Sequence, residues 1–418
     1  MVNIKEFAKR HSVILQNLSF LSILQIFLLI APLITYPYLT QTLGRELYGY
    51  IISAQVLASY FSIIIDFGSN SVCAKHVSQN RDNKEKLSEI VCSVFYTRLL
   101  LWIIGLFVLL AVVMLIPTYR EQWLLFLLTY GVTTNELLFP QYFFQGIEKM
   151  KYSTIINITI KSVFIALIFV VVKEQSDYIF VPILNTIGYL SGGFVAMFTI
   201  FKTMGINWSR PNIKAMKSYI KDSSTIFATD LICTIKDKLN YLFVGLFAGM
   251  DNVVIYDLGS KLYNLLIQPN NIIKTVLFPR MAQTRNINAF KKSLLLTLGI
   301  SVVLVGIVNI FLPQIVEFFL HEQIVLWPIR LFLLAPIIVS VSVMIANNLC
   351  VAFGYNKYVL YSIIITTITY LVAFAIMYFC DMLQYTYSFI LLAIISFLTE
   401  LIYRLFVYKK IVKLECNK

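Results

Sequence analysis

Long blocks of continuously apolar residues recur along the chain from Val13 to Tyr403, separated by shorter polar or basic stretches. Each block is close to the roughly 20 residues that a helix needs to cross the hydrocarbon core of a bilayer. Strands of a membrane barrel would be about ten residues long and would alternate apolar and polar positions. The pattern predicts an all-α, polytopic membrane protein with twelve transmembrane helices, at residues 14–36, 48–72, 92–116, 123–146, 153–172, 178–201, 223–248, 253–279, 293–316, 327–351, 358–380 and 385–403.

Lysine and arginine are distributed unequally between the loops that these spans define. The face that holds both termini carries 24 of the 34 Lys and Arg residues, whereas the opposite face carries only Arg45, Arg120 and Lys173. Cytoplasmic loops carry an excess of this kind. We therefore expect a multi-pass protein with both termini in the cytoplasm. The net charge of +13 then reflects topology, and no nucleic-acid partner is expected.

The longest predicted loop, residues 202–222, lies at the midpoint of the chain. It predicts an N-terminal lobe at 1–201 with spans 1 to 6, a cytoplasmic basic connector at 202–222, and a C-terminal lobe at 223–418 with spans 7 to 12 and a basic tail. Six spans in each half are typical of parallel structural repeats, with a binding site between them near the bilayer midplane. Similar short outer turns begin at Gly44 and Gly249, and this similarity is weak sequence evidence for such a repeat.

The connector allows two interpretations. Ile213, Met216 and Ile220 recur at helical spacing beside three lysines, which is the pattern of an amphipathic helix in the headgroup region. The same residues also fit an ordinary solvated basic loop.

Composition and motifs exclude several classes of protein. With 59% hydrophobic and 13% charged residues, the chain is far too apolar for a water-soluble domain. The six cysteines are scattered without paired spacing, so they predict packing residues rather than disulfides or a metal site. There is no H-E-x-x-H, no phosphate-binding loop and no long external loop. We therefore expect neither an enzyme nor an ATP-driven pump, and no cofactor or metal.

Polar residues inside the apolar blocks are the main functional signal. Asp257, Lys261, Asn264, Gln268 and Asn271 follow one another at intervals of 4, 3, 4 and 3, which places them on one helical face, and Lys274 extends the stripe. Charged groups at bilayer depth cost at least about 2.5 to 3.5 kcal/mol each, so they normally face a bundle interior or a wet cavity.

Additional lysines lie well inside other spans and would make such a cavity electropositive, as phosphate or carboxylate binding requires. The predicted substrate cavity consists of Lys161, Lys236, Lys238, Asn240, Lys261, Asn264, Gln268, Asn271 and Lys274. In the alternative interpretation these charges only neutralise one another between helices, for example Lys236 with Asp257 or Asp237 with Lys261.

Four acidic residues within or near the spans are candidates for ion coupling: Asp66, Glu136, Asp237 and Glu400. Asp66 lies near the inner end of its span, so its carboxylate also has the option of reaching the cytoplasm.

Five segments, in this order along the chain, resemble the bacterial O-antigen flippases, the polysaccharide-transport branch of the multidrug/oligosaccharidyl-lipid/polysaccharide exporters. They are Pro37-Tyr-Leu-Thr-Gln-Thr-Leu-Gly-Arg-Glu-Leu-Tyr-Gly49, Asp66-Phe-Gly68, Asn80-Arg-Asp-Asn-Lys-Glu-Lys86, Phe143-Phe-Gln-Gly-Ile-Glu-Lys-Met-Lys-Tyr152 and Leu277-Phe-Pro-Arg280. The resemblance covers residues 14 to about 285, and the last four spans match mainly in layout.

The resemblance implies two six-helix lobes around a central cavity that opens to one side at a time. It also implies a function, the movement of an undecaprenyl-diphosphate-linked oligosaccharide across the bacterial inner membrane for O-antigen or capsule synthesis. Membrane lipids, a polysaccharide polymerase and a chain-length regulator are the expected partners. Two alternatives remain: a multidrug antiporter of the same superfamily, which predicts an acid-dominated cavity, and a polytopic polysaccharide polymerase, which the short external loops disfavour.

Overall fold

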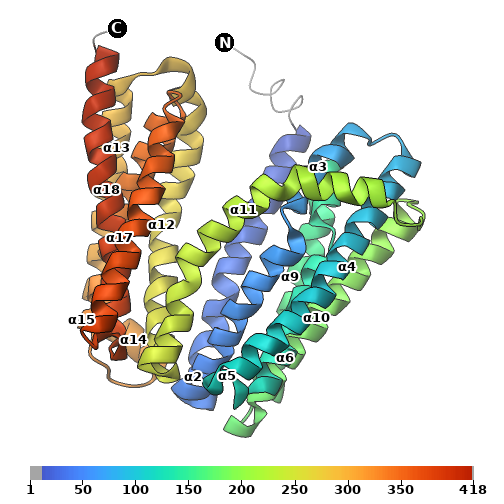
Figure 1. Ribbon diagram of the computed structural model, residues 1–418, viewed down its shortest axis with the longest axis horizontal. Helices are drawn as coiled ribbons and strands as arrows, with labels where there is room; N and C mark the ends of the chain where they lie inside the picture. Colours follow the sequence, from blue (N-terminus) through green and yellow to red (C-terminus); the bar gives the residue numbers. More distant parts are fainter. Residues whose placement is uncertain (1–11, 417–418) are drawn as a thin grey trace. The chain divides into compact units, whose positions relative to one another are not determined.

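Helix α2 (Ser12–Asp66; Figure 1) contains the first predicted span and most of the second. Its helical geometry is interrupted at Gly44. The computed structural model describes the backbone of residues 12–416 and their side chains, except those at positions 12–15, 18, 233, 236, 237 and 416. Gly44 has φ 78° and ψ 164°, a conformation that is essentially restricted to glycine. One long apolar segment therefore becomes two helical halves at this turn.

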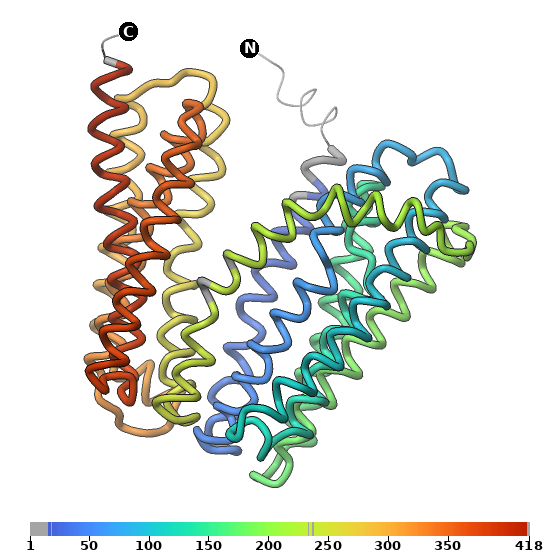
Figure 2. Tube along the Cα trace, viewed as in Figure 1, coloured from blue at the N-terminus to red at the C-terminus, as the bar shows by residue number. Residues whose placement is uncertain are grey.

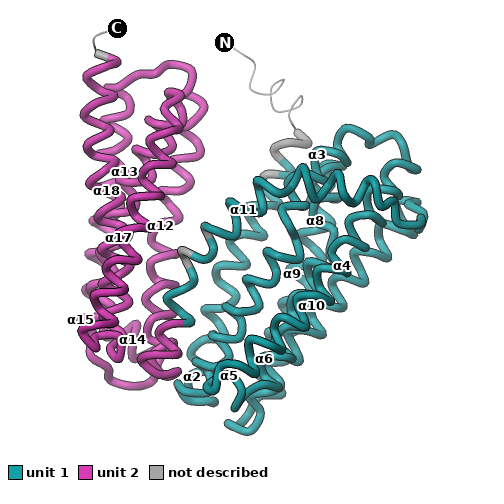
Figure 3. The backbone as a smooth tube through the Cα atoms, in the orientation of Figure 1, with its two compact units in different colours: residues 1–242 teal, residues 243–418 magenta. Residues whose placement is uncertain are grey.

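The chain forms two compact units, residues 1–242 and 243–418 (Figure 3). In unit 1, α9 packs against both α2 and α10, and α6 packs against α2. The elements of this unit after α2 are α3 (Ser69–Gln79), α4 (Lys84–Leu115), α5 (Pro117–Arg120), α6 (Trp123–Tyr130), η1 (Gly131–Thr133), α7 (Thr134–Leu138), α8 (Gln141–Gly146), α9 (Met150–Val171), η2 (Gln175–Ile179), α10 (Phe180–Phe198), η3 (Thr199–Thr203) and α11 (Ile213–Phe243), whose last residue lies beyond the unit boundary.

In unit 2, α18 packs against α17 and α16, and α13 packs against α12 and α16. Phe290, Ile345, Leu349 and Ile411 form part of its buried apolar core. Its elements are η4 (Val244–Ala248), α12 (Met250–Thr284), α13 (Ile287–Ile310), α14 (Leu312–Leu320), α15 (Trp327–Phe332), α16 (Ala335–Met344), η5 (Ile345–Val351), α17 (Asn356–Phe379), η6 (Met382–Gln384) and α18 (Thr386–Cys416).

The prediction of an all-α, multi-pass protein is confirmed. Within residues 12–416, eight helical segments are long and apolar enough to cross a membrane, and the predicted number of twelve stays a prediction. The segment 123–146 is broken into α6, η1, α7 and α8, with Pro140 immediately before α8. Helix α18 runs past the predicted span end at 403 to Cys416, so most of the residues predicted as a basic tail are helical.

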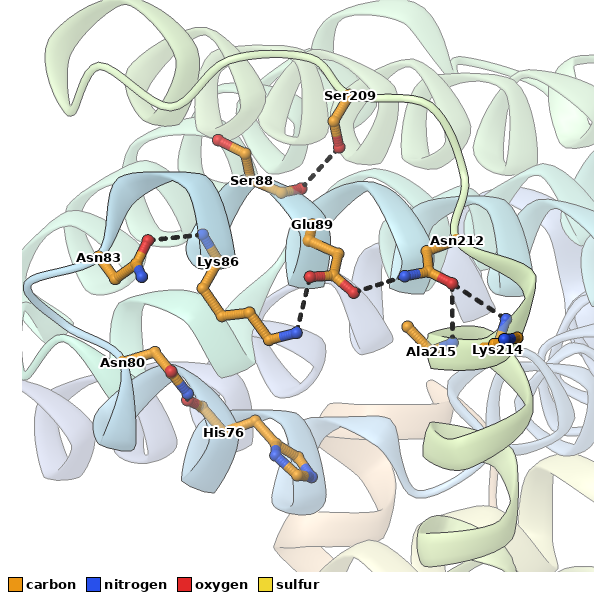
Figure 4. Close-up of polar contacts among 10 residues, drawn as sticks. All are labelled: His76, Asn80, Asn83, Lys86, Ser88, Glu89, Ser209, Asn212, Lys214 and Ala215. Carbon is orange, nitrogen blue, oxygen red and sulfur yellow. Dashed lines mark hydrogen bonds and ion pairs between the residues drawn. The ribbon is translucent and has the colours of Figure 1, made fainter.

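The predicted connector contributes the first residues of α11, whose trace is seen in Figure 2. Asn212 initiates the helix, because its side-chain oxygen accepts hydrogen bonds from the backbone nitrogens of Lys214 and Ala215 (Figure 4). Its amide donates to Glu89 at 2.8 Å, and Glu89 also pairs with Lys86. These contacts fix the start of α11 on the first turns of α4. This part of the connector is therefore helical.

The two turns with similar sequences, which begin at Gly44 and Gly249, also share a backbone conformation. Gly249 has φ 99° and ψ 153°, close to the values of Gly44, and it likewise precedes a long helix. Two positions about half a chain apart thus require glycine for the same steric reason. This correspondence supports an internal repeat.

Candidate functional site

The polar stripe predicted in the eighth span lies on the long helix α12. Asp257 is buried and forms an ion pair with Lys261 one turn away, on the same helix. Asn264 and Gln268 are exposed, and Asn271 accepts a hydrogen bond from Lys274 Nζ at 3.3 Å. The stripe therefore contains a neutralised segment around Asp257 and a cationic segment around Lys274.

Lys274 is half-buried at the C-terminal end of the stripe. Among the side chains that the structure describes, it forms no ion pair, and its hydrogen-bond partner is the neutral amide of Asn271. Its backbone oxygen accepts a hydrogen bond from Asn348 Nδ2 at 3.1 Å, which ties this turn of α12 to η5. A half-buried ammonium without an acidic partner is a group that an incoming anion would stabilise.

The remaining predicted cavity residues lie in unit 1. Lys161 on α9 lies 4.8 Å from the ring centroid of Tyr189 on α10 and makes a cation–π contact. On α11, Lys238 is half-buried and Asn240 is buried. Lys236, like the acidic candidate Asp237, lies outside the described side chains. A chamber lined by residues of both units stays a prediction.

Asp66 forms an ion pair with Arg98, which is only 2% exposed. The guanidinium also donates to Ser69 Oγ from Nε at 2.9 Å and to the backbone oxygen of Glu136 from Nη1 at 2.5 Å. One arginine thus links the inner end of α2 to α3, α4 and α7. The Asp66 side chain is 17% exposed, and a role of this carboxylate in ion coupling stays a prediction.

Glu136 lies beside Arg98 but does not take part in the ion pair between Arg98 and Asp66. Its backbone oxygen receives a hydrogen bond from Arg98, whereas its carboxylate accepts one from Asn135 Nδ2 at 3.2 Å. Two predicted ion-coupling acids, Asp66 and Glu136, are therefore brought together around a single arginine. Sequence reasoning placed Arg98 inside a span but gave it no role. The signal that would have identified it was its position: Arg98 is the one basic residue of the predicted span 92–116, and this span follows the one that contains Asp66.

Glu400 is paired in a similar way within unit 2. Its carboxylate lies 2.5 Å from Arg404, one turn along α18. Arg404 also donates to Ser362 Oγ at 3.2 Å and to Ser342 Oγ at 3.0 Å, so it crosslinks α18, α17 and α16. The sequence assigned Arg404 to the basic tail, but it is buried in the structure because α18 continues through that region.

The described residues contain no group of three or more His, Cys, Asp or Glu side chains arranged to hold a metal ion. Cys73, Cys92 and Cys350 are buried free thiols, and Cys380 is an exposed one. The polar groups present are suited to binding and to ion pairing.

Comparisons with known proteins agree with the membrane fold. The family described as polysaccharide biosynthesis protein matches residues 14–285. A relative from Escherichia coli (strain K12) that bears the provisional name O-antigen transporter is 24% identical over 281 residues, which are 67% of this chain and 68% of the relative. A relative from Shigella dysenteriae with the same provisional name is 22% identical over 358 residues, 83% of this chain and 89% of the relative.

Among solved structures, the inward-facing conformation of a multidrug resistance MATE family transporter of the MOP superfamily is similar, with a TM-score of 0.72. It is 12% identical, and the match covers 96% of this chain and 99% of that transporter, which establishes a shared fold. Since the family model spans well over half of the sequence, this multi-pass membrane chain belongs to the polysaccharide biosynthesis protein family.

Proposed function

We propose that this protein is a flippase that moves an undecaprenyl-diphosphate-linked oligosaccharide repeat across the bacterial inner membrane, by alternating access of two lobes around a cationic cavity. Its relatives are named as O-antigen transporters, which supports transport rather than catalysis. The proposal places both termini in the cytoplasm. A polysaccharide polymerase and a chain-length regulator would act on the exported repeat.

The observation that carries the proposal is the environment of Lys274, meaning its burial and its hydrogen-bond partner. Its ammonium group is half-buried on the polar face of α12, and among the described side chains it has an amide partner and no acidic one. A lipid diphosphate carries at least two negative charges, and lysine binds phosphate as a point charge. The neighbouring amides of Asn264, Gln268 and Asn271 supply the hydrogen-bonding groups that sugar hydroxyls require.

The order of lysines along α12 suggests a path for the diphosphate. Arg280 is exposed, and Lys274 and Lys261 follow at increasing distance from the inner loop. In this scheme Arg280 and Lys274 receive the headgroup on the cytoplasmic side, and Lys261, together with Lys236, accepts it later. Lys261 would then exchange its intrahelical partner Asp257 for the phosphate.

A multidrug antiporter is the competing function, since solved MATE transporters share the fold. Cationic drugs need acidic groups that lack basic partners. Asp66, Asp257 and Glu400, by contrast, are each paired with a basic side chain. The carboxylate of Glu136 accepts a hydrogen bond from Asn135 and has the cationic Arg98 beside it. The arrangement therefore favours an anionic substrate.

The test is complementation of a strain that lacks this gene, with surface polysaccharide as the readout and membrane expression measured in parallel. Lys274→Ala should reduce polymer strongly, and Lys274→Arg should restore much of it, because arginine keeps the positive charge. Lys291→Ala is the matched control, since Lys291 is an exposed lysine on the neighbouring helix α13. Normal polymer in the Lys274→Ala strain at normal expression would exclude this lysine from substrate binding.

A further inference from the structure

An open depression of about 600 Å³ lies in unit 2, where the end of α17 meets the start of α18. It is lined by Phe247, Tyr378, Phe379, Asp381, Leu383 and Gln384. In Figure 1 this end of α18 is the one remote from the C-terminus. Phe247 lies in η4, directly before α12, whereas Lys274 and Arg280 lie towards the other end of that helix. In the proposed scheme the depression is therefore at the exit end of the path.

Three aromatic rings of the depression are accessible. Phe379 is 82% exposed, Tyr378 53% and Phe247 40%. The rings of Tyr378 and Phe379 meet edge to face at 5.7 Å, and those of Phe247 and Tyr378 do so at 6.3 Å. Edge-to-face contacts leave ring faces available to a further partner.

Polar groups also line the depression. Asp381 is exposed and has φ 53°, in the left-handed region, and Gln384 Nε2 donates to its backbone oxygen at 3.1 Å. Asp381 and Gln384 lie in the turn between α17 and α18, outside the predicted spans 358–380 and 385–403, so the rings beside them are at the water-facing end of these helices. Ring faces next to a carboxylate and an amide are suited to a sugar, whose C–H face stacks on the ring while its hydroxyls form hydrogen bonds.

We propose that this depression is a saccharide-binding subsite that takes the glycan portion of the exported lipid at the exit side. The inference deepens the proposed function and rests on it. The volume is within the range of about 300 to 1,000 Å³ that is common for ligand pockets. Glycan binding here would hold the headgroup away from the cationic path after translocation, and so oppose its return.

The exposed thiol of Cys380 provides a direct assay, because it lies between the lining residues Phe379 and Asp381. The full-length chain carrying Cys233→Ser and Cys416→Ser would be reconstituted in nanodiscs and treated with a membrane-impermeant maleimide. The probe is the water-soluble oligosaccharide released by mild acid from the lipid-linked pool of the producing strain. At a concentration about ten times its Kd it should slow labelling about tenfold, as simple occupancy requires.

Phe379→Ala should abolish most of this protection, and Asp381→Asn should weaken it. Phe311→Ala is the control, since Phe311 is 54% exposed at the end of α13 and lies outside the depression. Unchanged labelling of the parent chain with saccharide present would overturn the subsite, and so would full protection of the Phe379→Ala chain.

Surface polysaccharide in the complemented strain separates this inference from the proposed function. If the parent chain restores polymer but the saccharide never slows Cys380 labelling, the subsite is wrong and the transport role stands. If the saccharide protects Cys380 but no polymer is restored, the subsite stands and the flippase assignment is wrong.

Discussion

Arg81 and Glu148 form an ion pair, with Arg81 Nη2 2.7 Å from Glu148 Oε1. Arg81 Nε also donates to the backbone oxygen of Gly146 at 2.7 Å. Arg81 lies in the turn between α3 and α4, whereas Glu148 lies between α8 and α9. The pair therefore joins two turns that are far apart in the sequence.

Unit 2 contains a corresponding contact, made by Arg285. Arg285 follows α12, and its Nη2 donates to the backbone oxygen of Phe353 at 3.0 Å. Its Nη1 lies 3.9 Å from a carboxylate oxygen of Glu415. Arg81 thus follows the second predicted span and holds the carbonyl at the end of the fourth, and Arg285 follows the eighth predicted span and holds a carbonyl just after the end of the tenth. Together with Gly44 and Gly249, this contact supports a structural repeat of six spans.

Glu148→Gln should lower the thermal stability of the purified protein in detergent at neutral pH. The hydrogen bond from Arg81 holds the pKa of Glu148 below its ordinary value of 4.5. A lowered acid pKa adds stability that is complete above the ordinary pKa and is lost as the pH falls through the lowered one. The difference in Tm between parent and variant should therefore be present at neutral pH and disappear in acid.

Asp82→Asn is the control for this prediction, because Asp82 is an exposed acid in the same turn as Arg81. It should leave Tm nearly unchanged throughout. A Tm difference for Glu148→Gln that persists unchanged below the lowered pKa would show that the variant acts through packing rather than through charge.

The helical class and the polar stripe of α12 could be read from sequence because both depend on local periodicity. Continuous apolar blocks of bilayer length define helices without reference to the rest of the chain, and intervals of three and four define a face. The residues that pack against that face, and therefore the burial of each residue on it, cannot be predicted from local periodicity. Asp257 and Asn264 are both on the stripe, yet the first is buried and the second exposed.

The arginines were missed for the same physical reason. Arg98 and Asp66 are on different spans, and their contact depends on the three-dimensional register between α4 and the end of α2. Arg404 was assigned to the basic tail because it follows the last predicted span, which ends at residue 403. A buried arginine is compatible with the interior of a helix bundle when it donates to two serines and to an adjacent carboxylate, as Arg404 does. A hydropathy pattern does not reveal those partners.

Gly249→Ala should destabilise the protein by about 1 to 3 kcal/mol, since its positive φ and extended ψ are costly for a residue with a Cβ atom. The matched control is Gly299→Ala on α13, where an added Cβ meets no atom within 4 Å. That replacement should be neutral or stabilising by up to about 1 kcal/mol, because alanine is the better helix former. Thermal unfolding of both variants in the same detergent checks the prediction, and equal stabilities would contradict it.

Arg98→Ala should be more damaging, by about 3 to 5 kcal/mol, because it leaves the Asp66 carboxylate without its buried partner. The double variant Asp66→Ala/Arg98→Ala should recover part of the loss, since the Asp66 carboxylate is then removed together with its partner. Arg120→Ala, at an exposed arginine outside the predicted spans, should have little effect. Unfolding midpoints and membrane expression provide the measurements. A double variant less stable than Arg98→Ala would indicate that the pair acts mainly by packing.

Glu136→Gln should separate ion coupling from stability. Its side-chain oxygen accepts one hydrogen bond from Asn135, and glutamine retains an oxygen at that position, so the unfolding midpoint should change little. If Glu136 carries the coupling proton, transport in proteoliposomes driven by a proton gradient should fall to the undriven rate in this variant. Asp66→Asn should instead lower the unfolding midpoint, because Asp66 is held by Arg98. Parent protein whose transport is indifferent to proton and sodium gradients would remove the coupling role from both acids.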